Sequence, residues 1–546
     1  MFSLPSISFL FLFLSVLALT RTYYRRNSKC IRKIRGPPRP SLLLGHEWMM
    51  HNQKNFGELE MKWFQEYGTV FRVGGCFGQD VLMLSDPKAL KCILHISGYR
   101  FPKVPDTVHL FTALIGLGVA TAEGAVHQRQ RKILNPAFSA SQLRQSLPLF
   151  QSFASKLINK LKHEIGNDGA GRVVDVILWT RKVALDIIGI TAFRYRFNAL
   201  DDGASELREA LRNVLVESQG SPSCLELLYI SLWRIGMPKL ALQILDLIPS
   251  RGQARSLRFK NCSYRIASEI LQKQLEVVEN GTETADKDIA NLLALSYLAE
   301  DPDKRMNVDE IYSQLATFTL GGHETTATTV AWILYELSLH PFIQNKIREE
   351  ISQRREKCRG DLDTDDYDSL SLLNAVIKET LRLHPFVSTL IRVANEDNVV
   401  PLSEPVTTSD GTVVWDIPVI KGQALMLSIY TYNRLPSVWG NDADKWNPER
   451  FLHPTGIKET NLGMYANLVT FGAGVRACIG YRWFGLCRIM EMQVLVTELL
   501  STFEFSPSEE GLELQHMNAL HTVTPVVKGR AYEGEQVPLR VALVKG

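Results

Sequence analysis

The chain contains the stretch Phe471-Gly472-Ala473-Gly474-Val475-Arg476-Ala477-Cys478-Ile479-Gly480, and an apolar run with helical spacing follows it. Cys478 therefore stands in a glycine-rich loop at the start of an expected helix. Backbone N–H groups and the positive end of the helix dipole favour an ionised sulfur, which is a strong metal ligand. Glycines let the backbone approach a flat, bulky group. The stretch therefore predicts a thiolate site. The alternative interpretation of the same stretch is a buried cysteine after a turn.

The composition is that of an ordinary globular protein. The 546 residues are 45% hydrophobic and 22% charged, with a net charge of +3. So small a positive surplus gives no indication of a nucleic-acid partner. The eight cysteines show no C-x2-C spacing, which argues against a zinc site or a thioredoxin motif. Scattered thiols of this kind are typical of a reducing, cytosolic environment.

The N-terminus differs from the rest of the chain. Residues 1–20 carry no charge, and seven basic residues follow between Arg21 and Arg35. About twenty helical residues span the apolar core of a bilayer. A cleaved signal peptide would carry its positive charge in front, so we favour a signal-anchor helix with the body on the cytoplasmic side. Gly36-Pro37-Pro38-Arg39-Pro40 then predicts a stiff, extended hinge.

A second motif, Leu320-Gly321-Gly322-His323-Glu324-Thr325-Thr326, lies inside a helical pattern from Val308 to Leu339. Two glycines in a helix interior cost about 1 kcal/mol each relative to alanine, and they permit a local kink where a ligand or water enters. The acid and alcohol that follow suit proton delivery. A zincin motif H-E-x-x-H is excluded because position 327 is alanine.

Two further segments complete the pattern. Glu379-Thr380-Leu381-Arg382 spaces an acid and a base three apart, so that they can pair on one helix face. Trp446-Asn447-Pro448-Glu449-Arg450-Phe451 follows downstream.

Together these motifs resemble the cytochrome P450 family. Residues 471–480 match its haem-binding pattern F-x-x-G-x-R-x-C-x-G at every defined position, and residues 321–326 match its [A/G]-G-x-[D/E]-T-[T/S] element. The resemblance runs from the N-terminal anchor to about Gly529 and looks most like fungal members that decorate terpenoids or other secondary metabolites. It implies the cytochrome P450 fold, mainly α with a small β-rich part, behind a single N-terminal transmembrane helix.

The resemblance assigns a role to each motif. Cys478 would be the axial ligand of a haem b iron, with Phe471, Gly472 and Gly322 next to the cofactor. Arg131, Arg392, Arg476 and His127 would bind the haem propionates, although the family usually has tryptophan at the position of His127. Glu324 and Thr325 would deliver protons. Glu379, Arg382 and Arg450 would form a buried structural triad.

The resemblance also implies a domain organisation and partners. We expect a transmembrane segment at 1–20, a basic and proline-rich hinge at 21–45 and one catalytic domain at 46–546. The expected activity is NADPH-dependent monooxygenation of a lipophilic substrate in the endoplasmic reticulum membrane. Electrons would come from NADPH–cytochrome P450 reductase, since no dinucleotide-binding fingerprint occurs. The alternatives are an isomerase or dehydratase that needs no external electrons, and a non-enzymatic haem-binding protein.

Local patterns give further expectations about secondary structure. Helices are expected over Glu58–Tyr67 and Val308–Leu339, a hairpin of two strands over Val70–Leu84, strands over Val413–Tyr430, and a hairpin over Met517–Pro525. Phe101–Val119 is expected to be an irregular loop, and Asp361–Asp368 a solvated acidic loop.

Overall fold

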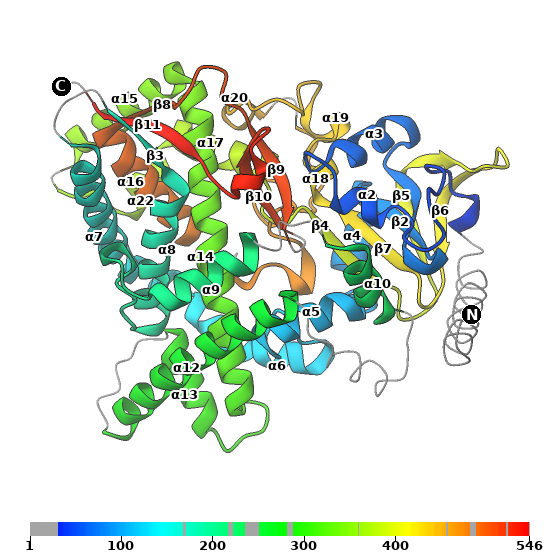
Figure 1. Ribbon diagram of the computed structural model, residues 1–546, viewed down its shortest axis with the longest axis horizontal. Coiled ribbons are helices and arrows are strands. Elements are labelled where there is room, and N and C mark those ends of the chain that lie inside the picture. The colour runs from blue at the N-terminus through cyan, green and yellow to red at the C-terminus, as the bar shows by residue number, and fades with distance from the viewer. Residues whose placement is uncertain are drawn as a thin grey trace, which may run out of the picture.

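The structure is a computed structural model that describes residues 31–166, 171–216, 222–234, 251–280, 288–358, 360–454, 457–480, 487–519 and 522–544. It is mostly helical, with four small sheets (Figure 1). The expected membrane anchor at 1–20 and residues 21–30 of the hinge lie outside the described residues. Among the helices that are described, none has both the length and the apolar character needed to cross a bilayer.

The helices are α2 (Glu47–His51), α3 (Glu58–Tyr67), α4 (Pro87–Lys91), α5 (Pro105–Ile115), α6 (Gly124–Leu134), α7 (Ala140–Ile165), α8 (Val176–Phe193), α9 (Ser205–Val216), α10 (Cys224–Leu232), α12 (Arg251–Glu279), α13 (Ile289–Leu298), α14 (Val308–Leu339), α15 (Pro341–Lys357), α16 (Thr364–Ser369), α17 (Ser371–Leu383), α18 (Ile429–Tyr432), α19 (Pro436–Trp439), α20 (Glu449–Leu452) and α22 (Cys487–Thr502). The strands are β1 (Val70–Gly74), β2 (Asp80–Leu84), β3 (Arg172–Asp175), β4 (Thr389–Val393), β5 (Asn398–Thr407), β6 (Val413–Val419), β7 (Ala424–Ser428), β8 (Phe503–Pro507), β9 (Leu514–Ala519), β10 (Thr522–Val527) and β11 (Pro538–Leu543).

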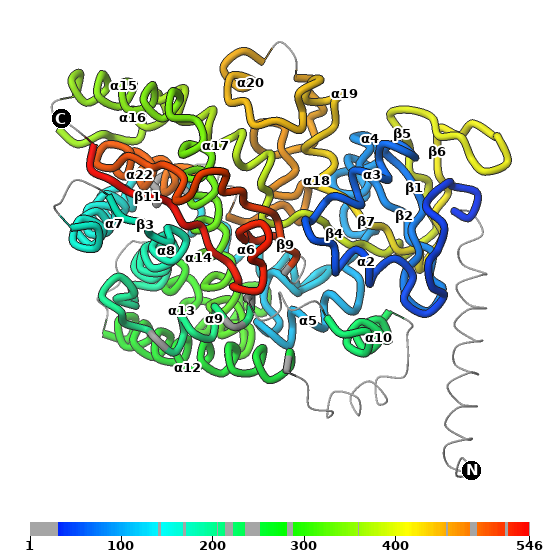
Figure 2. The backbone as a smooth tube through the Cα atoms, turned by 45° about the horizontal axis from the view of Figure 1, so that its top comes forward, coloured from blue at the N-terminus to red at the C-terminus, as the bar shows by residue number. Residues whose placement is uncertain are grey.

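Helix α14 is the central support of the helical part. It has the bounds expected from the sequence, and a capping box between Asn307 and Glu310 begins it. It runs through the middle of the helical part in both views (Figures 1 and 2) and packs against α8, α12, α22 and β8. Gly321 and Gly322 do not interrupt it. Trp332, near its C-terminal end, is almost fully buried, so neighbouring helices cover most of its surface.

The largest sheet has the strand order β1-β2-β7-β4. The hairpin expected over Val70–Leu84 is confirmed, since β1 and β2 pair antiparallel. Met50 of α2 and Trp63 of α3 pack on the apolar residues of these strands. In β4, Arg392 lies opposite Leu425 of β7. The pairing of β4 with β7 thereby fixes the position of Arg392.

Two expected loops contain helices instead. Phe101–Val119 includes α5, because Pro105 is compatible with the first helical turn and Gly116 (φ +79°) ends the helix. Asp361–Asp368 includes α16, since the Asp363 side chain accepts a hydrogen bond from the Asp366 backbone N–H. Both loop predictions were wrong because proline and aspartate, which are typical of loops, also occur at helix N-termini, where they begin a helix.

The C-terminal part closes the fold. β9 and β10 form the hairpin expected near Met517–Pro525, with Thr522 opposite Ala519. β11 lies between β3 and β8 in a three-stranded sheet. The main hydrophobic core includes residues from Ile31 to Val541, and two smaller clusters are separate from it. Segments from both ends of the described chain thus share the main core, to which Ala473 of the cysteine loop also belongs.

Candidate active site

The cysteine loop has a constrained backbone. Gly472 and Gly474 both have φ of +66°, and a Cβ added at Gly474 would lie 1.9 Å from the carbonyl oxygen of Leu94. The Cys478 N–H donates to the Phe471 carbonyl at 2.8 Å, and residues 479–480 are helical. Cys478 is exposed. The loop therefore holds an exposed cysteine at a helix start, and the predicted thiolate ligand stays a prediction.

A cluster of basic side chains surrounds this loop. Arg131 donates to the Ala477 carbonyl at 2.5 Å. Arg476 pairs with Glu123, and Lys103 approaches the same carboxylate at 3.5 Å. Arg392 joins the group, because Lys103 and Arg392 form an isolated β-bridge. Three of the four predicted propionate-binding residues are therefore brought together with Lys103, which the sequence did not single out; the fourth, His127, lies beside them.

The cluster carries more positive than negative charge. Burial, together with the positive charge of Arg476, lowers the pKa of Arg392 to about 10. Burial also lowers the pKa of Lys103 to about 8, despite the opposing effect of Glu123. A buried cation that lacks full compensation is costly. The cluster is therefore suited to an anionic ligand that would supply the missing negative charge.

His127 lies within the same cluster. Its side chain is buried, and the Tyr99 hydroxyl lies 2.7 Å from its Nδ1 atom. Burial, together with the charge of Arg476, lowers the pKa of His127 to about 3, so the imidazole is neutral. In the tautomer in which Tyr99 donates to Nδ1, the ring proton is on Nε2 and His127 can still donate one hydrogen bond. Its predicted role stays a prediction.

At the glycine motif, one face of α14 is accessible to solvent; this is called the open face below. Gly321 is exposed and Thr325 is half-buried, one turn apart, within a helix whose centre is otherwise largely buried. The Thr325 hydroxyl donates to the Gly321 carbonyl at 2.9 Å. Gly322 is buried, and its predicted position next to the cofactor stays a prediction. Because successive residues of a helix point about 100° apart, Gly321 and not Gly322 lies on the open face with Thr325.

Glu324 points into a buried ion-pair cluster. Its Oε2 atom accepts from Arg181 Nε at 2.9 Å and from Arg181 Nη2 at 2.7 Å. Arg181 Nη2 also contacts Oε2 of Glu535. Burial raises the pKa of both glutamates. No sequence pattern pointed to Arg181 or Glu535, since they lie far from Glu324 along the chain.

The third motif forms a buried brace beneath the cysteine loop. Arg382 binds Glu379 through two hydrogen bonds of 2.7 and 2.8 Å, and Arg450 Nε lies 3.5 Å from the same carboxylate. Arg382 also donates to the Asn433 carbonyl at 2.6 Å. The Asn433 amide donates to the Thr470 hydroxyl at 3.0 Å. The brace thus reaches the residue that precedes the cysteine loop.

Comparison with known proteins agrees with this arrangement. The family model for cytochrome P450 matches residues 35–529. This chain belongs to the cytochrome P450 family. It is similar to cytochrome P450 monooxygenase 91 of Postia placenta, 32% identical with 88% of each chain covered. It is also similar to ganoderic acid synthetase CYP5150L8 of Ganoderma lucidum, 34% identical over 81% of this chain and 82% of the relative. The mostly helical fold and the oxidoreductase class follow from this membership.

The cytochrome P450 family implies a haem cofactor, and the residues present fit one. The two propionates of haem b are anions, and they would face the basic side chains of Arg131, Arg392, Arg476 and Lys103, of which Arg476 and Lys103 share the carboxylate of Glu123. Cys478 supplies an accessible sulfur beside the same cluster through the Arg131–Ala477 hydrogen bond. Both the ligand and the counter-charges of the cofactor are therefore present.

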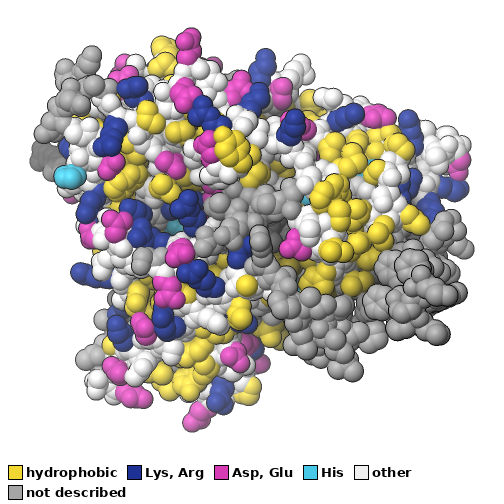
Figure 3. Space-filling model, in the orientation of Figure 1, with side chains coloured by type: hydrophobic (Ala, Val, Ile, Leu, Met, Phe, Trp, Pro, Cys, Tyr) yellow, Lys and Arg dark blue, Asp and Glu magenta, His cyan; other side chains and the backbone are white. Residues whose placement is uncertain are grey.

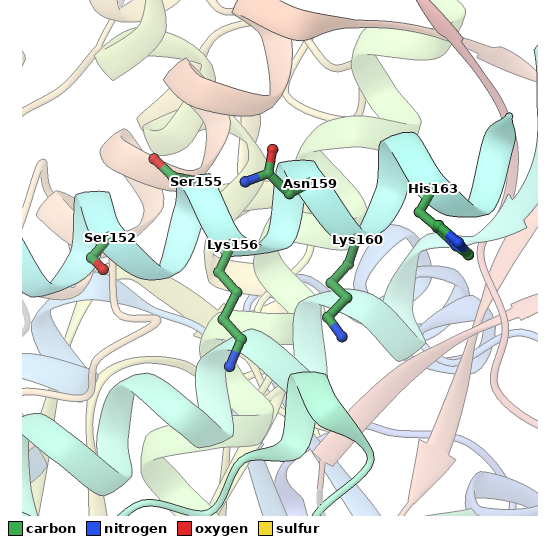
Figure 4. A pocket seen from close by; sticks show the side chains of 6 residues that line it. All are labelled: Ser152, Ser155, Lys156, Asn159, Lys160 and His163. Atoms are coloured by element: carbon green, nitrogen blue, oxygen red, sulfur yellow. The ribbon is translucent and has the colours of Figure 1, made fainter. Parts of the chain in front are cut away.

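A surface groove lies away from these motifs. A groove along α7 is lined by Ser152, Ser155, Lys156, Asn159, Lys160 and His163 (Figure 4). Lys156 and Lys160 both pair with Asp201, at 2.5 and 2.8 Å, so one carboxylate offsets part of their charge. None of the motif residues lines this groove. It is a solvated helix face and contributes nothing to the site.

Proposed function

We propose that this cytochrome P450 is a haem-thiolate monooxygenase that inserts one oxygen atom from O2 into a lipophilic substrate by C–H hydroxylation or epoxidation. The observation that carries the proposal is the accessible sulfur of Cys478 beside an under-compensated buried cluster of basic groups. When bound, a haem with a thiolate ligand supplies O2 activation, because the sulfur donates electron density to the iron.

The residues of this chain would do the remaining work. Arg131, Arg392 and Arg476 would bind and orient the cofactor by charge, and the positive φ of Gly472 and Gly474 lets the loop approach it closely. Thr325 presents its hydroxyl on the open face of α14. Glu324 would hold and release the protons that monooxygenation consumes.

We place the substrate among terpenoids or other secondary metabolites. The similarity to a relative named ganoderic acid synthetase supports this class, as does the likeness of the motifs to fungal secondary-metabolism enzymes. Electrons are proposed to come from NADPH through NADPH–cytochrome P450 reductase.

The endoplasmic reticulum membrane is the proposed location, with residues 1–20 as its anchor. Exposed apolar side chains support a nearby lipid surface: Leu42 and Met49 are 41% exposed and Leu225 is 78% exposed. Figure 3 shows hydrophobic side chains gathering over the half of the molecule that carries α2 and α3. Flotation of microsomes with full-length protein, compared with protein lacking residues 2–20, tests the anchor.

The central test compares the wild-type enzyme with Cys478→Ala. The reduced wild-type protein should give the carbon-monoxide difference spectrum of a thiolate-bound haem, and Cys478→Ala should lose it. Survival of that spectrum in the variant would refute the ligand assignment. Wild-type protein with reductase should form product only when NADPH is supplied. Product formed without NADPH would instead indicate an isomerase or dehydratase.

A further inference from the structure

We propose that Glu535 and Glu324 share one proton across Arg181, and that Glu535 is a positioning residue that keeps Glu324 able to receive that proton. The role in turnover rests on the proposed monooxygenation. The shared proton itself is a property of the buried cluster and can be tested without product formation.

The geometry places two carboxylates against one nitrogen. Arg181 Nη2 contacts Oε2 of both Glu324 and Glu535. The side chains of these glutamates are 1% and 0% exposed, and that of Arg181 is 11% exposed. One guanidinium therefore faces two carboxyl groups that solvent does not screen.

The charges of the cluster do not balance if both glutamates are ionised. Two carboxylates and one guanidinium would leave a net negative charge in a buried site, which is strongly unfavourable. The Oε1 atoms of both glutamates accept no hydrogen bond from any described residue. A carboxyl group that is deprived of donors is most easily neutralised by a proton on that oxygen, and one proton suffices to balance the cluster.

Among the described residues, the other elements around the cluster add no second lysine or arginine to it. On α14, His323 Nδ1 lies 3.3 Å from Glu324 Oε1. Asp175 of β3 is a further acidic neighbour, and its Oδ1 atom accepts from the Val537 N–H at 2.8 Å. Thr524 of β10 hydrogen-bonds to Glu535. Lys182, next to Arg181 on α8, pairs with Asp202 instead.

The proposed step is a simple proton transfer. With the shared proton on Glu324, its O–H bond breaks as the proton leaves towards Thr325, and Glu324 and Glu535 are then both ionised next to Arg181. A proton from solvent enters on the side of Asp175, which is only partly buried, and forms an O–H bond on Glu535. That bond breaks as an O–H bond forms on Glu324, so the negative charge moves from Glu324 to Glu535 and Glu324 again holds the shared proton. No redox change occurs within the cluster.

Infrared spectroscopy of the holoenzyme tests the shared proton. We expect one protonated-carboxyl C=O band from the cluster, and we expect both Glu535→Gln and Glu324→Gln to remove that same band. Glu60→Gln is the matched control, since Glu60 is a buried glutamate on α3 whose pKa is raised by burial. α3 lies at the opposite end of the molecule from α8 (Figure 1), so Glu60→Gln should leave the cluster band in place.

Turnover tests the positioning role. In Glu535→Gln, Arg181 faces only one carboxylate, so the pKa of Glu324 falls. The fraction of NADPH converted into product should drop several-fold at neutral pH, and its pH profile should shift to the acid side by about one unit. Glu535→Asp should restore part of the coupling, which a purely structural role would not predict.

Three results would overturn the proposal. The first is two separate bands, each lost in only one variant; the second is no cluster band in the wild-type protein. The third is a Glu535→Gln variant with unchanged coupling and pH profile. If the wild-type protein formed no product with NADPH and reductase, the proposed function would fail, whereas the infrared result would still decide on the shared proton.

Discussion

Replacement of Glu379 by glutamine should strongly destabilise this protein. Glu379 and Arg382 are both 0% exposed, and Arg450 is 6% exposed. Glutamine retains the shape of the side chain but removes its charge. Two buried guanidinium groups then face a neutral amide, although one carboxylate compensates part of their charge in the wild-type protein.

The magnitude follows from what remains around Arg382. Removing one partner of a buried ion pair costs about 3–5 kcal/mol. Arg382 would keep its hydrogen bonds to the carbonyl groups of Asn433, Ala443 and Lys445, and the glutamine oxygen can still accept one bond. We therefore expect a loss near the lower end of this range, about 3 kcal/mol of unfolding free energy.

Urea unfolding followed by circular dichroism measures this loss. The matched control is Glu513→Gln, which breaks the exposed Lys528–Glu513 pair and should leave stability unchanged, because exposed pairs contribute little. Since the brace reaches Thr470 through Asn433, folded Glu379→Gln protein should also show a smaller carbon-monoxide signal per chain. A loss below about 1 kcal/mol, or one no larger than that of the control, would refute the proposed brace.

Three further predictions concern single positions. Burial raises the pKa of Glu336 to about 7, so the stabilisation by its protonated carboxyl group is fully present below pH 4.5 and is lost as pH rises to about 7. Glu336→Gln should therefore remove up to about 3 kcal/mol from the change in unfolding free energy between pH 5 and 8, measured by urea unfolding. An unchanged dependence of the unfolding free energy on pH would contradict this. Gly474→Ala should lower haem content per chain several-fold, because its Cβ would collide with the Leu94 carbonyl; pyridine-haemochrome analysis measures this, and wild-type content would show that the loop can shift. Thr325→Ala should increase the NADPH consumed per product formed, and unchanged coupling would argue against a role in proton delivery.

Local signals were enough to predict much of the architecture. The bounds of α3 and α14 agree with the sequence predictions, because glycine caps one helix at both ends and a capping box starts the other. The β1–β2 hairpin was predictable from two short strand patterns around glycines. The same kind of signal was misinterpreted at Pro105 and Asp363, where residues typical of loops begin helices.

Contacts between distant segments could not be predicted in this way. Lys103 joins the basic cluster through a β-bridge to Arg392, and Glu535 reaches Glu324 only because β11 returns beside β3. The sequence predicts Glu324 as an acid but does not give its partner. Neither spacing nor composition records which carboxylate a buried arginine will face, since that depends on the packing of whole elements.

The two buried clusters of this cytochrome P450 are electrostatically opposite. Around the cysteine loop, Arg131, Arg392, Arg476 and Lys103 outnumber Glu123. Next to the open face of α14, Glu324 and Glu535 outnumber Arg181. An excess of buried cations favours a permanent anion, since a guanidinium does not readily give up its proton. An excess of buried carboxylates is relieved most cheaply by a proton. One imbalance therefore suits the retention of an anionic cofactor, and the other suits the storage of a proton for reaction.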